Sequence, residues 1–177
     1  MDVVEEPLPG VYRIRLRELA DARGRFVKTY SHSTFLAAGI AFDFREEYFS
    51  VSKKNVVRGM HFQIPPHDHD KVVYCAVGAV EDVLLDIRSG PEYGRVYSIV
   101  LSSDQPEVLF IAKGVAHGFR SLTDDSLMVY KTSTEYAPQH DRGILWNSFG
   151  HDWRISDPIL SDRDRCHPAI GEFVSPF

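Results

Sequence analysis

The sequence has little cysteine, no long apolar run and no block of basic residues. Its two cysteines, Cys75 and Cys166, are too few and too far apart for a disulfide framework or a zinc knuckle, so we expect two reduced thiols. No window approaches the roughly 18 apolar residues that a membrane helix needs. The first residues are acidic where a secretory signal would be basic. These absences predict a cytoplasmic protein that has no membrane partner.

Positive charge is scarce as well. The 20 Lys and Arg residues are outnumbered by 25 Asp and Glu residues, which gives a formal net charge of -5. No cluster of basic residues marks a surface for a polyphosphate backbone, so we exclude nucleic acid as a partner. The 177 residues suffice for one globular domain and are too few for two. We therefore expect residues 1–177 to form a single domain.

Short segments rich in Val, Ile, Phe and Tyr recur between turn signals, which is typical of a β sandwich or barrel. The clearest is 80–88, where Val83, Leu85 and Ile87 alternate with a more polar set, so that one face is apolar and the other mixed. The ten predicted strands cover 11–17, 26–30, 46–52, 56–63, 71–77, 80–88, 95–101, 107–112, 116–121 and 127–132. So many strands in so short a chain predict an all-β fold closed into a barrel or double sheet.

Helices are predicted to be short and peripheral. Residues 31–34 offer N-caps for a helix over 35–38, and Gly39 ends it. The hydroxyl of Ser161 can cap a second turn over 162–164. The tail from Gly143 onward is predicted to pack as irregular chain against the barrel.

Histidines supply the first candidates for chemistry. His61 lies near a strand end before Pro65 and Pro66, where a barrel would have its mouth. Taken alone, such a residue is more often a packed or surface histidine. His117 stands between Gly114 and Gly118, where the backbone can approach a ligand, although a turn that needs glycine explains the glycines equally well.

A second group of histidines invites a metal interpretation. His67 and His69 are spaced to face one ion from an extended chain, with His117 as a third ligand. The glutamate that would complete this pattern is absent, because Val73 or Tyr74 stands in its place. A solvated loop is therefore the better interpretation, and a metal site is kept as an alternative.

Four further residues could contribute to a site, and each also has an ordinary structural interpretation. Lys71 opens an apolar strand, so its amine either reaches water or points into the cavity. Tyr130 and Tyr136 would ordinarily be core residues with satisfied hydroxyls. Asp164 would ordinarily be part of a solvated charge run.

Several ordered blocks together resemble the dTDP-4-dehydrorhamnose 3,5-epimerase family, sugar-nucleotide epimerases built on a cupin jelly roll. The blocks are Ala22-Arg23-Gly24-Arg25-Phe26, the run 52–63 with Arg58-Gly59-Met60-His61-Phe62-Gln63, Asp82 to Arg88, Gly114 to Phe119, Tyr130-Lys131, Gly143 to Asn147 and Leu160 to Asp164. The resemblance therefore extends over nearly the whole chain and implies a cupin jelly-roll barrel.

The resemblance also implies roles that the chemistry can accommodate. A 4-keto sugar has acidic hydrogens at C3 and C5, so epimerisation needs a base on one face, an acid on the other and a cation for the enolate. By similarity His61 is the base, oriented and made more basic by Asp164. Tyr130 resembles the acid, and Lys71 matches the cation near the C4 oxygen. No metal or organic cofactor is implied.

Further residues are implied to bind the nucleotide-sugar substrate. They are Arg23, Phe26, Lys28, Glu46, Tyr48, Arg58, Gln63, His117 and Tyr136. The family also implies a homodimer in which an N-terminal arm, about residues 1–30, reaches the partner; the exposed Phe26 and Tyr30 would suit this or the chain's own core. Tyr48, Phe49, Tyr74 and His69 differ from the residues usual in the family, so the base of the nucleotide stays open.

One geometric difficulty leads to a specific prediction. Strict alternation along 56–63 would send Arg58 and His61 to opposite faces of the strand. A bulge at Gly59 would bring both to one site, so we predict an irregular strand there. Three alternatives remain: a sugar-nucleotide 3,4-ketoisomerase, a metal cupin, and a sugar-binding cupin without catalysis.

Overall fold

The computed structural model describes residues 1–177 and contains thirteen strands, two short α-helices and one 3-10 helix. The strands are β1 (Asp2–Leu8), β2 (Val11–Arg15), β3 (Glu18–Asp21), β4 (Gly24–Val27), β5 (Glu46–Ser52), β6 (Val57–Gln63), β7 (Lys71–Val77), β8 (Ala79–Asp86), β9 (Val96–Ser102), β10 (Glu107–Ile111), β11 (Val115–Ser121), β12 (Ser126–Thr132) and β13 (Asp141–Gly143). The helices are α1 (His32–Ala37), α2 (Asp162–Arg165) and η1 (Ile170–Glu172).

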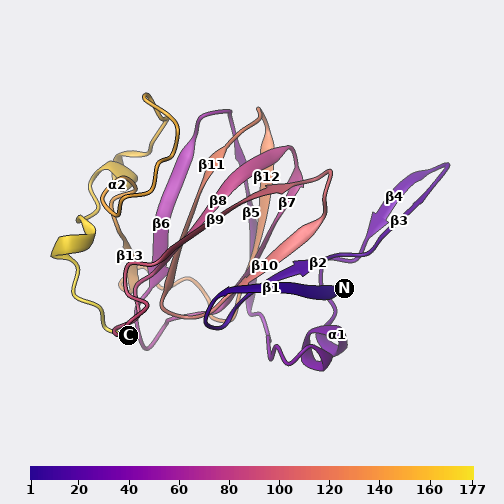
Figure 1. The fold of residues 1–177 in the computed structure, drawn as a ribbon, viewed down its shortest axis with the longest axis horizontal. Coiled ribbons are helices and arrows are strands. Elements are labelled where there is room, and N and C mark those ends of the chain that lie inside the picture. The colour runs from indigo at the N-terminus through magenta and orange to yellow at the C-terminus, as the bar shows by residue number, and fades with distance from the viewer.

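Two antiparallel sheets face each other and form a jelly roll, which confirms the predicted all-β fold (Figure 1). One sheet has six strands in the order β1-β2-β10-β7-β12-β5, and the other has five in the order β13-β6-β11-β8-β9. The side chains between the sheets form one core cluster, which includes Leu84, Leu109, Phe119, Met128 and Tyr130. No helix of the structure is both long and apolar enough to cross a membrane.

Alternation along β8 decides what each of its faces contacts. Val83 and Leu85 point outward and join a cluster with Trp153 from the C-terminal segment. Leu84 belongs to the cluster between the sheets, and Asp82 on the same face contacts His117 there. The mixed face therefore lines the barrel interior, and both faces are buried.

Each sheet has a cover on its outer face. The segment that contains α1 packs Phe35, Ile40 and Phe42 on the six-stranded sheet. The C-terminal segment, yellow in Figure 1, covers the five-stranded sheet and carries α2. This packing confirms that the tail from Gly143 lies against the barrel. It also places α2 beside β6, where His61 lies.

All ten predicted strands are present, most of them with ends shifted by one or two residues. The strand predicted over 26–30 is an exception: β4 ends at Val27, because Tyr30 turns inward and donates a hydrogen bond from its hydroxyl to the Phe42 carbonyl (2.7 Å). Three strands were not predicted, namely β1, β3 and β13. They are rich in charged residues or very short, so no apolar alternation marks them.

The hairpin β3–β4 projects away from the barrel (Figure 1). Its side chains are exposed on both strands except Val27, and Leu19 and Phe26 pair across it. Phe26 is 59% exposed, whereas Tyr30 packs on Phe35 in the chain's own core. Of Phe26 and Tyr30, therefore, only Phe26 is exposed and available to contact another protein surface.

Candidate active site

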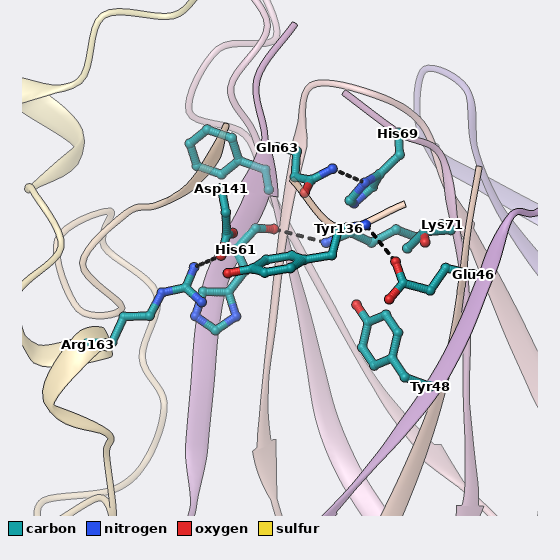
Figure 2. Close-up of a pocket in the computed structure, with 11 residues that line it drawn as sticks. Glu46, Tyr48, His61, Gln63, His69, Lys71, Tyr136, Asp141 and Arg163 are labelled. Carbon is teal, nitrogen blue, oxygen red and sulfur yellow. Dashed lines mark hydrogen bonds and ion pairs between the residues drawn. The ribbon is translucent and has the colours of Figure 1, made fainter. Parts of the chain in front are cut away.

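Two neighbouring cavities open between the sheets and share three lining side chains, Tyr48, His61 and Lys71. The outer cavity has a volume of about 320 Å³ and the inner one about 190 Å³. Around the outer cavity, the side chains point inward from β5, β6, β7 and α2 (Figure 2). The outer cavity is lined by Glu46, Tyr48, His61, Phe62, Gln63, His69, Lys71, Thr132, Tyr136, Asp141 and Arg163. The inner cavity is lined by Tyr48, Ser50, Arg58, His61, Lys71, His117, Gly118, Phe119 and Tyr130.

The predicted bulge at Gly59 is confirmed. His117 pairs with His61 and Phe119 with Arg58, so three steps on β6 match two on β11. Gly59 has a φ of +128°, which favours glycine. The extra residue resets the alternation, and Arg58 and His61 therefore line the same inner cavity.

His61 forms a close pair with Asp164. Its Nε2 lies 2.5 Å from Oδ1 of Asp164, which is buried on α2. The hydroxyl of Ser161 accepts a hydrogen bond from the Asp164 amide, as the predicted cap requires, and so fixes the start of that helix. The other ring nitrogen of His61, Nδ1, has no partner in the chain, and the ring lines both cavities.

The pKa of His61 differs from the expectation. Burial lowers it, and this effect outweighs the rise that Asp164 causes. Lys71 and Arg163 lower it further. Burial alone would raise the pKa of Asp164, but its contacts with the His167 and His61 rings bring it below its ordinary value. At neutral pH the pair is therefore a neutral imidazole next to a carboxylate.

Lys71 points into the cavities rather than out to water. Its side chain is buried, and Nζ donates a hydrogen bond to the carbonyl oxygen of His61 (3.1 Å). Burial lowers the pKa of Lys71 to about 8. An amine with so few partners is available to an anion that enters the cavity.

Tyr130 faces the inner cavity from the sheet opposite His61. Its hydroxyl shares a hydrogen bond with Ser50 (3.1 Å), and its ring stacks on that of Tyr48 with centroids 4.8 Å apart. Burial raises the pKa of Tyr130 well above its ordinary value, so the phenol keeps its proton. Burial also raises the pKa of Tyr48 to about 12.

Two polar pairs lie deeper in the inner cavity. Nε2 of His117 lies 2.8 Å from Oδ2 of Asp82, and both residues are buried. Nε of Arg58 donates to the hydroxyl of Ser52 (3.0 Å). The glycine that follows His117 serves the fold rather than a ligand, because a Cβ on Gly118 would lie 2.8 Å from the Arg58 carbonyl oxygen.

The outer cavity contains the remaining predicted binding residues of the barrel. A carboxylate oxygen of Glu46 accepts a hydrogen bond from the Tyr136 amide (2.7 Å). The amide nitrogen of Gln63 donates to His69 Nδ1 (3.1 Å). Arg163, which sequence reasoning missed, forms an ion pair with Asp141 (2.7 Å) at the rim.

Three predicted binding residues lie elsewhere. Arg23 is at the tip of the β3–β4 hairpin, where it pairs with Asp21 and is exposed. Phe26 and Lys28 line a separate hollow with Met1 and do not reach His61 within this chain. The structure therefore divides the predicted set into a barrel group and an arm group.

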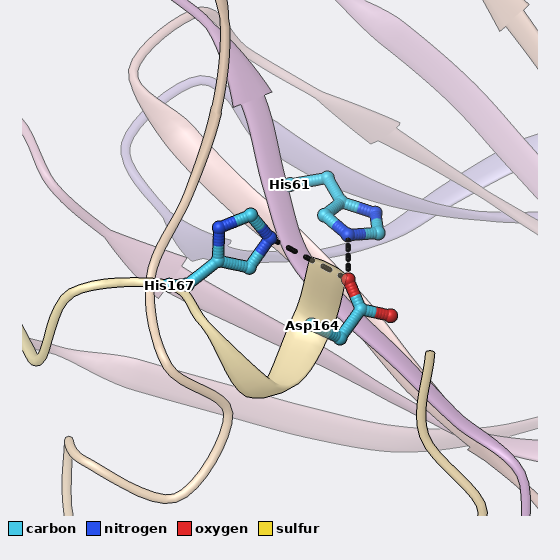
Figure 3. A group of neighbouring side chains, drawn as sticks. All are labelled: His61, Asp164 and His167. Carbon is cyan, nitrogen blue, oxygen red and sulfur yellow. Dashed lines mark hydrogen bonds and ion pairs between the residues drawn. The ribbon is translucent and has the colours of Figure 1, made fainter. Parts of the chain in front are cut away.

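The proposed metal ligands do not come together. His67 packs on the ring of His140, His69 bonds Gln63, and His117 bonds Asp82. A different trio does meet: His61, Asp164 and His167 place one ligand atom each within 4.8 Å of one another (Figure 3). Ligand atoms around a tetrahedral zinc ion would be roughly 3.3 Å apart. The 2.5 Å between His61 and Asp164 is instead the distance of a direct hydrogen bond.

Sequence reasoning missed several residues that contact the predicted set. Ser50 lies two residues from Tyr48 on one face of β5, so alternation alone could have found it. Asp82 stands on the mixed face of β8, which offered the same signal. His167 and Asp141 lie in irregular or very short segments, for which the sequence has no periodic signal.

Known proteins share this fold and align with most of this sequence. The profile of the family described as dTDP-4-dehydrorhamnose 3,5-epimerase matches residues 5–172. The Shigella flexneri protein of that name is 38% identical over 168 residues, 93% of each chain. The Bacillus anthracis enzyme, solved with TDP and pyrophosphate, superposes with a TM-score of 0.92 at 32% identity and covers 95% of this chain and 98% of its own. The Legionella pneumophila enzyme, in complex with dTDP-4-keto-L-rhamnose, has a TM-score of 0.92 at 27% identity and covers 98% and 94%.

The fold is thus that of the cupin jelly rolls, and the match to epimerases over nearly the whole chain places the protein among the isomerase-class enzymes of that fold. The chain belongs to the dTDP-4-dehydrorhamnose 3,5-epimerase family.

Proposed function

We propose that the protein inverts C3 and C5 of a dTDP-linked 4-keto-6-deoxy sugar. One observation carries the proposal: His61 and Tyr130 come from opposite sheets and line the same inner cavity. A sugar ring between them would present one face to an imidazole and the other to a phenol. Abstraction from one face and return on the other is what epimerisation requires.

His61 is the base in this proposal. Its Nδ1 takes the proton from C3 or C5, the C–H electron pair forms a C=C bond, and the C4 carbonyl becomes an enolate. Asp164 accepts the hydrogen of Nε2, which orients the ring and stabilises the imidazolium that forms. His61 therefore begins neutral and becomes positively charged only as it takes the proton.

Lys71 and Tyr130 complete the transfer. The buried ammonium of Lys71 stabilises the enolate oxygen, and such a preorganised charge is worth about 10²–10³ in rate. Tyr130 donates its proton to the opposite face of the carbon and becomes a phenolate, which solvent or a buffer acid reprotonates. The imidazolium of His61 releases its proton to solvent, so that both groups are restored before the second carbon reacts. The hydrogen bond to Ser50 stabilises that phenolate. Arg58 and His117 lie beside this group and contact the substrate.

The outer cavity accommodates the rest of the nucleotide sugar. Arg163 brings positive charge that suits a diphosphate, and Tyr48 and Tyr136 offer flat surfaces to a sugar or base. Glu46 and Gln63 supply hydrogen-bonding groups at the wall of the cavity. This cavity is continuous with the inner one through shared side chains, so one extended ligand can occupy both.

We also propose a homodimer in which the β3–β4 hairpin reaches the partner. The hairpin stands clear of its own barrel and exposes Leu19 and Phe26. In a dimer, Arg23, Phe26 and Lys28 would complete the nucleotide side of the partner's cavity.

Light scattering should give twice the chain mass, and Phe26→Asp should weaken both dimer formation and substrate binding. A monomer with full activity would contradict this. The cytoplasmic location stays a prediction.

Deuterium exchange tests the chemistry. The protein is incubated in heavy water with a dTDP-4-keto-6-deoxy sugar, and NMR counts the exchanged positions. We expect exchange at C3 and C5 with inversion. A product with a shifted carbonyl would favour the 3,4-ketoisomerase instead, and binding without any exchange would favour a non-catalytic cupin.

Variants assign the two faces. His61→Asn should abolish exchange, whereas Tyr130→Phe should retain exchange and lose inversion, because deprotonation continues without an acid on the far face. His32→Asn and Tyr12→Phe change the same residue types outside both cavities and should behave as wild type. Undiminished exchange by His61→Asn would refute the assigned base.

A further inference from the structure

His167 is a second imidazole directed at the carboxylate that holds His61. Its Nε2 lies 3.5 Å from Oδ1 of Asp164, the same oxygen that His61 contacts (Figure 3). The side chain of His167 is 11% exposed, and its ring meets that of His61 edge to face with centroids 5.6 Å apart. Two histidines from different parts of the chain therefore compete for one buried oxygen.

The surroundings of His167 leave its nitrogen no other partner. Nε2 is fully buried and makes no hydrogen bond within the chain. A buried polar atom without a partner is unfavourable unless a nearby charge compensates it. Since a bare lone pair facing a carboxylate would be repelled, Nε2 carries the hydrogen and points it at Asp164. The contact is therefore attractive and electrostatic, although too long for a strong hydrogen bond.

The fold keeps the imidazole in this position. The ring of His167 lies against Gly143 at the end of β13, where a Cβ would overlap it. Gly143 in turn pairs with His61 across the two strands. Pro168 follows His167, and its carbonyl accepts a hydrogen bond from the Leu145 amide (2.8 Å), so the chain that follows His167 is anchored. The position of His167 is thus built by the same strand pair that positions His61.

We propose that His167 is a positioning residue that tunes the base through Asp164. This inference rests on the proposed function of His61. By drawing on the carboxylate, His167 reduces the negative charge that His61 experiences and keeps the His61 ring neutral to lower pH. His61 then remains a neutral base in mildly acidic conditions, where Asp164 without the His167 contact would keep it protonated.

Other charges face the trio and must be considered together with it. Lys71 approaches from β7, Arg163 from α2, and Asp141 from β13, where it pairs with Arg163. Substitution of His167 leaves all three in place. A change in His61 titration that follows loss of the His167 imidazole can therefore be assigned to the contact with Asp164.

The test measures the His61 pKa directly by NMR of histidine-labelled protein, with His61→Asn identifying the resonance. His167→Leu should raise the His61 pKa by at least ~0.5 unit, and the acidic limb of kcat/KM should move to higher pH with it. His167→Gln, whose amide can still donate to Asp164, should restore much of the wild-type value. His32→Leu removes an exposed histidine remote from the site and should change neither.

A structural role alone predicts a different pattern. His167→Leu would then lower the melting temperature or kcat while the His61 titration stayed at its wild-type position, and that result in folded protein would overturn the proposal. The NMR titration does not depend on turnover. A shifted His61 pKa in a protein without exchange activity would therefore refute the proposed function and leave the tuning contact standing.

Discussion

Gly59 links the fold to the site, because its backbone forms the bulge that turns Arg58 and His61 into one cavity. A Cβ at Gly59 would lie 2.5 Å from the Cα of Gly118 and 3.0 Å from the His117 carbonyl oxygen. These neighbours are backbone atoms, which cannot move aside by rotating a side chain. Gly59→Ala therefore combines a strained φ with a clash between two central strands.

The magnitude follows from the two contributions. A residue held at such a φ costs about 1–3 kcal/mol, and an extra carbon forced into a packed interior costs about 1–3 kcal/mol more. We expect Gly59→Ala to lower the free energy of unfolding by about 2–6 kcal/mol. For a chain of this length each kcal/mol lowers the melting temperature by roughly 2–4 °C.

Gly90 provides the matched control. Its φ is +129°, but nothing lies within 4 Å of the Cβ that alanine would add. Gly90→Ala therefore has the backbone contribution alone, about 1–3 kcal/mol. The difference between the two variants isolates the clash between β6 and β11.

The assay combines urea unfolding, followed by circular dichroism, with deuterium exchange at a temperature where both variants are folded. We expect Gly59→Ala to lose about 10²-fold in exchange rate, since a displacement of about 1 Å in a catalytic group has that effect. Gly90→Ala should keep its rate per folded molecule. Equal losses of stability in the two variants, or a wild-type rate in folded Gly59→Ala, would refute this account of the bulge.

Three further substitutions test single contacts. Lys71→Gln should slow exchange by about 10²–10³. In wild type, kcat/KM should fall near pH 8, because the Lys71 ammonium is lost as pH rises through a pKa of about 8. The variant should lack this basic limb, and a limb that persists in it would contradict the assignment. Ser50→Ala should slow inversion by up to about 10-fold while exchange continues, because the Tyr130 hydroxyl loses one hydrogen bond. Equal loss of inversion and exchange would argue against Tyr130 as the acid. Asp82→Asn should destabilise the protein by about 3–5 kcal/mol in urea unfolding, because the buried His117 loses its carboxylate partner. An unchanged midpoint would show that the pair contributes nothing.

The acidic limb of the activity profile has a defined sign. Since burial and nearby cations lower the pKa of His61, the neutral base persists below the ordinary histidine pKa of about 6.5. Activity should therefore extend further into the acidic range than the histidine–carboxylate pair alone predicts. The sequence indicated the partner but not the burial that dominates the result.

Local patterns in the sequence predicted the class of fold, and the resemblance to a known family predicted many of the groups in the cavities. Period-two alternation is a local property, so Val83 and Leu85 identified a strand without any knowledge of its neighbours. The conflict between alternation and the shared site that the family resemblance implied likewise located the bulge at Gly59. The alternation in both cases depends only on residues that are adjacent along the chain, whereas the shared site was known only by resemblance.

Which residues far apart in the sequence come into contact follows from the assembled fold. The contact of Asp164 with His61 was expected only from the family resemblance. Ser50 contacts Tyr130 because sheet order places β5 beside β12, and no local period encodes that order. The same cause hid His167, which lies in irregular chain and acquires meaning only beside Asp164. Burial, and with it the direction of each pKa shift, is a property of the assembled barrel and not of the sequence around the titrating group.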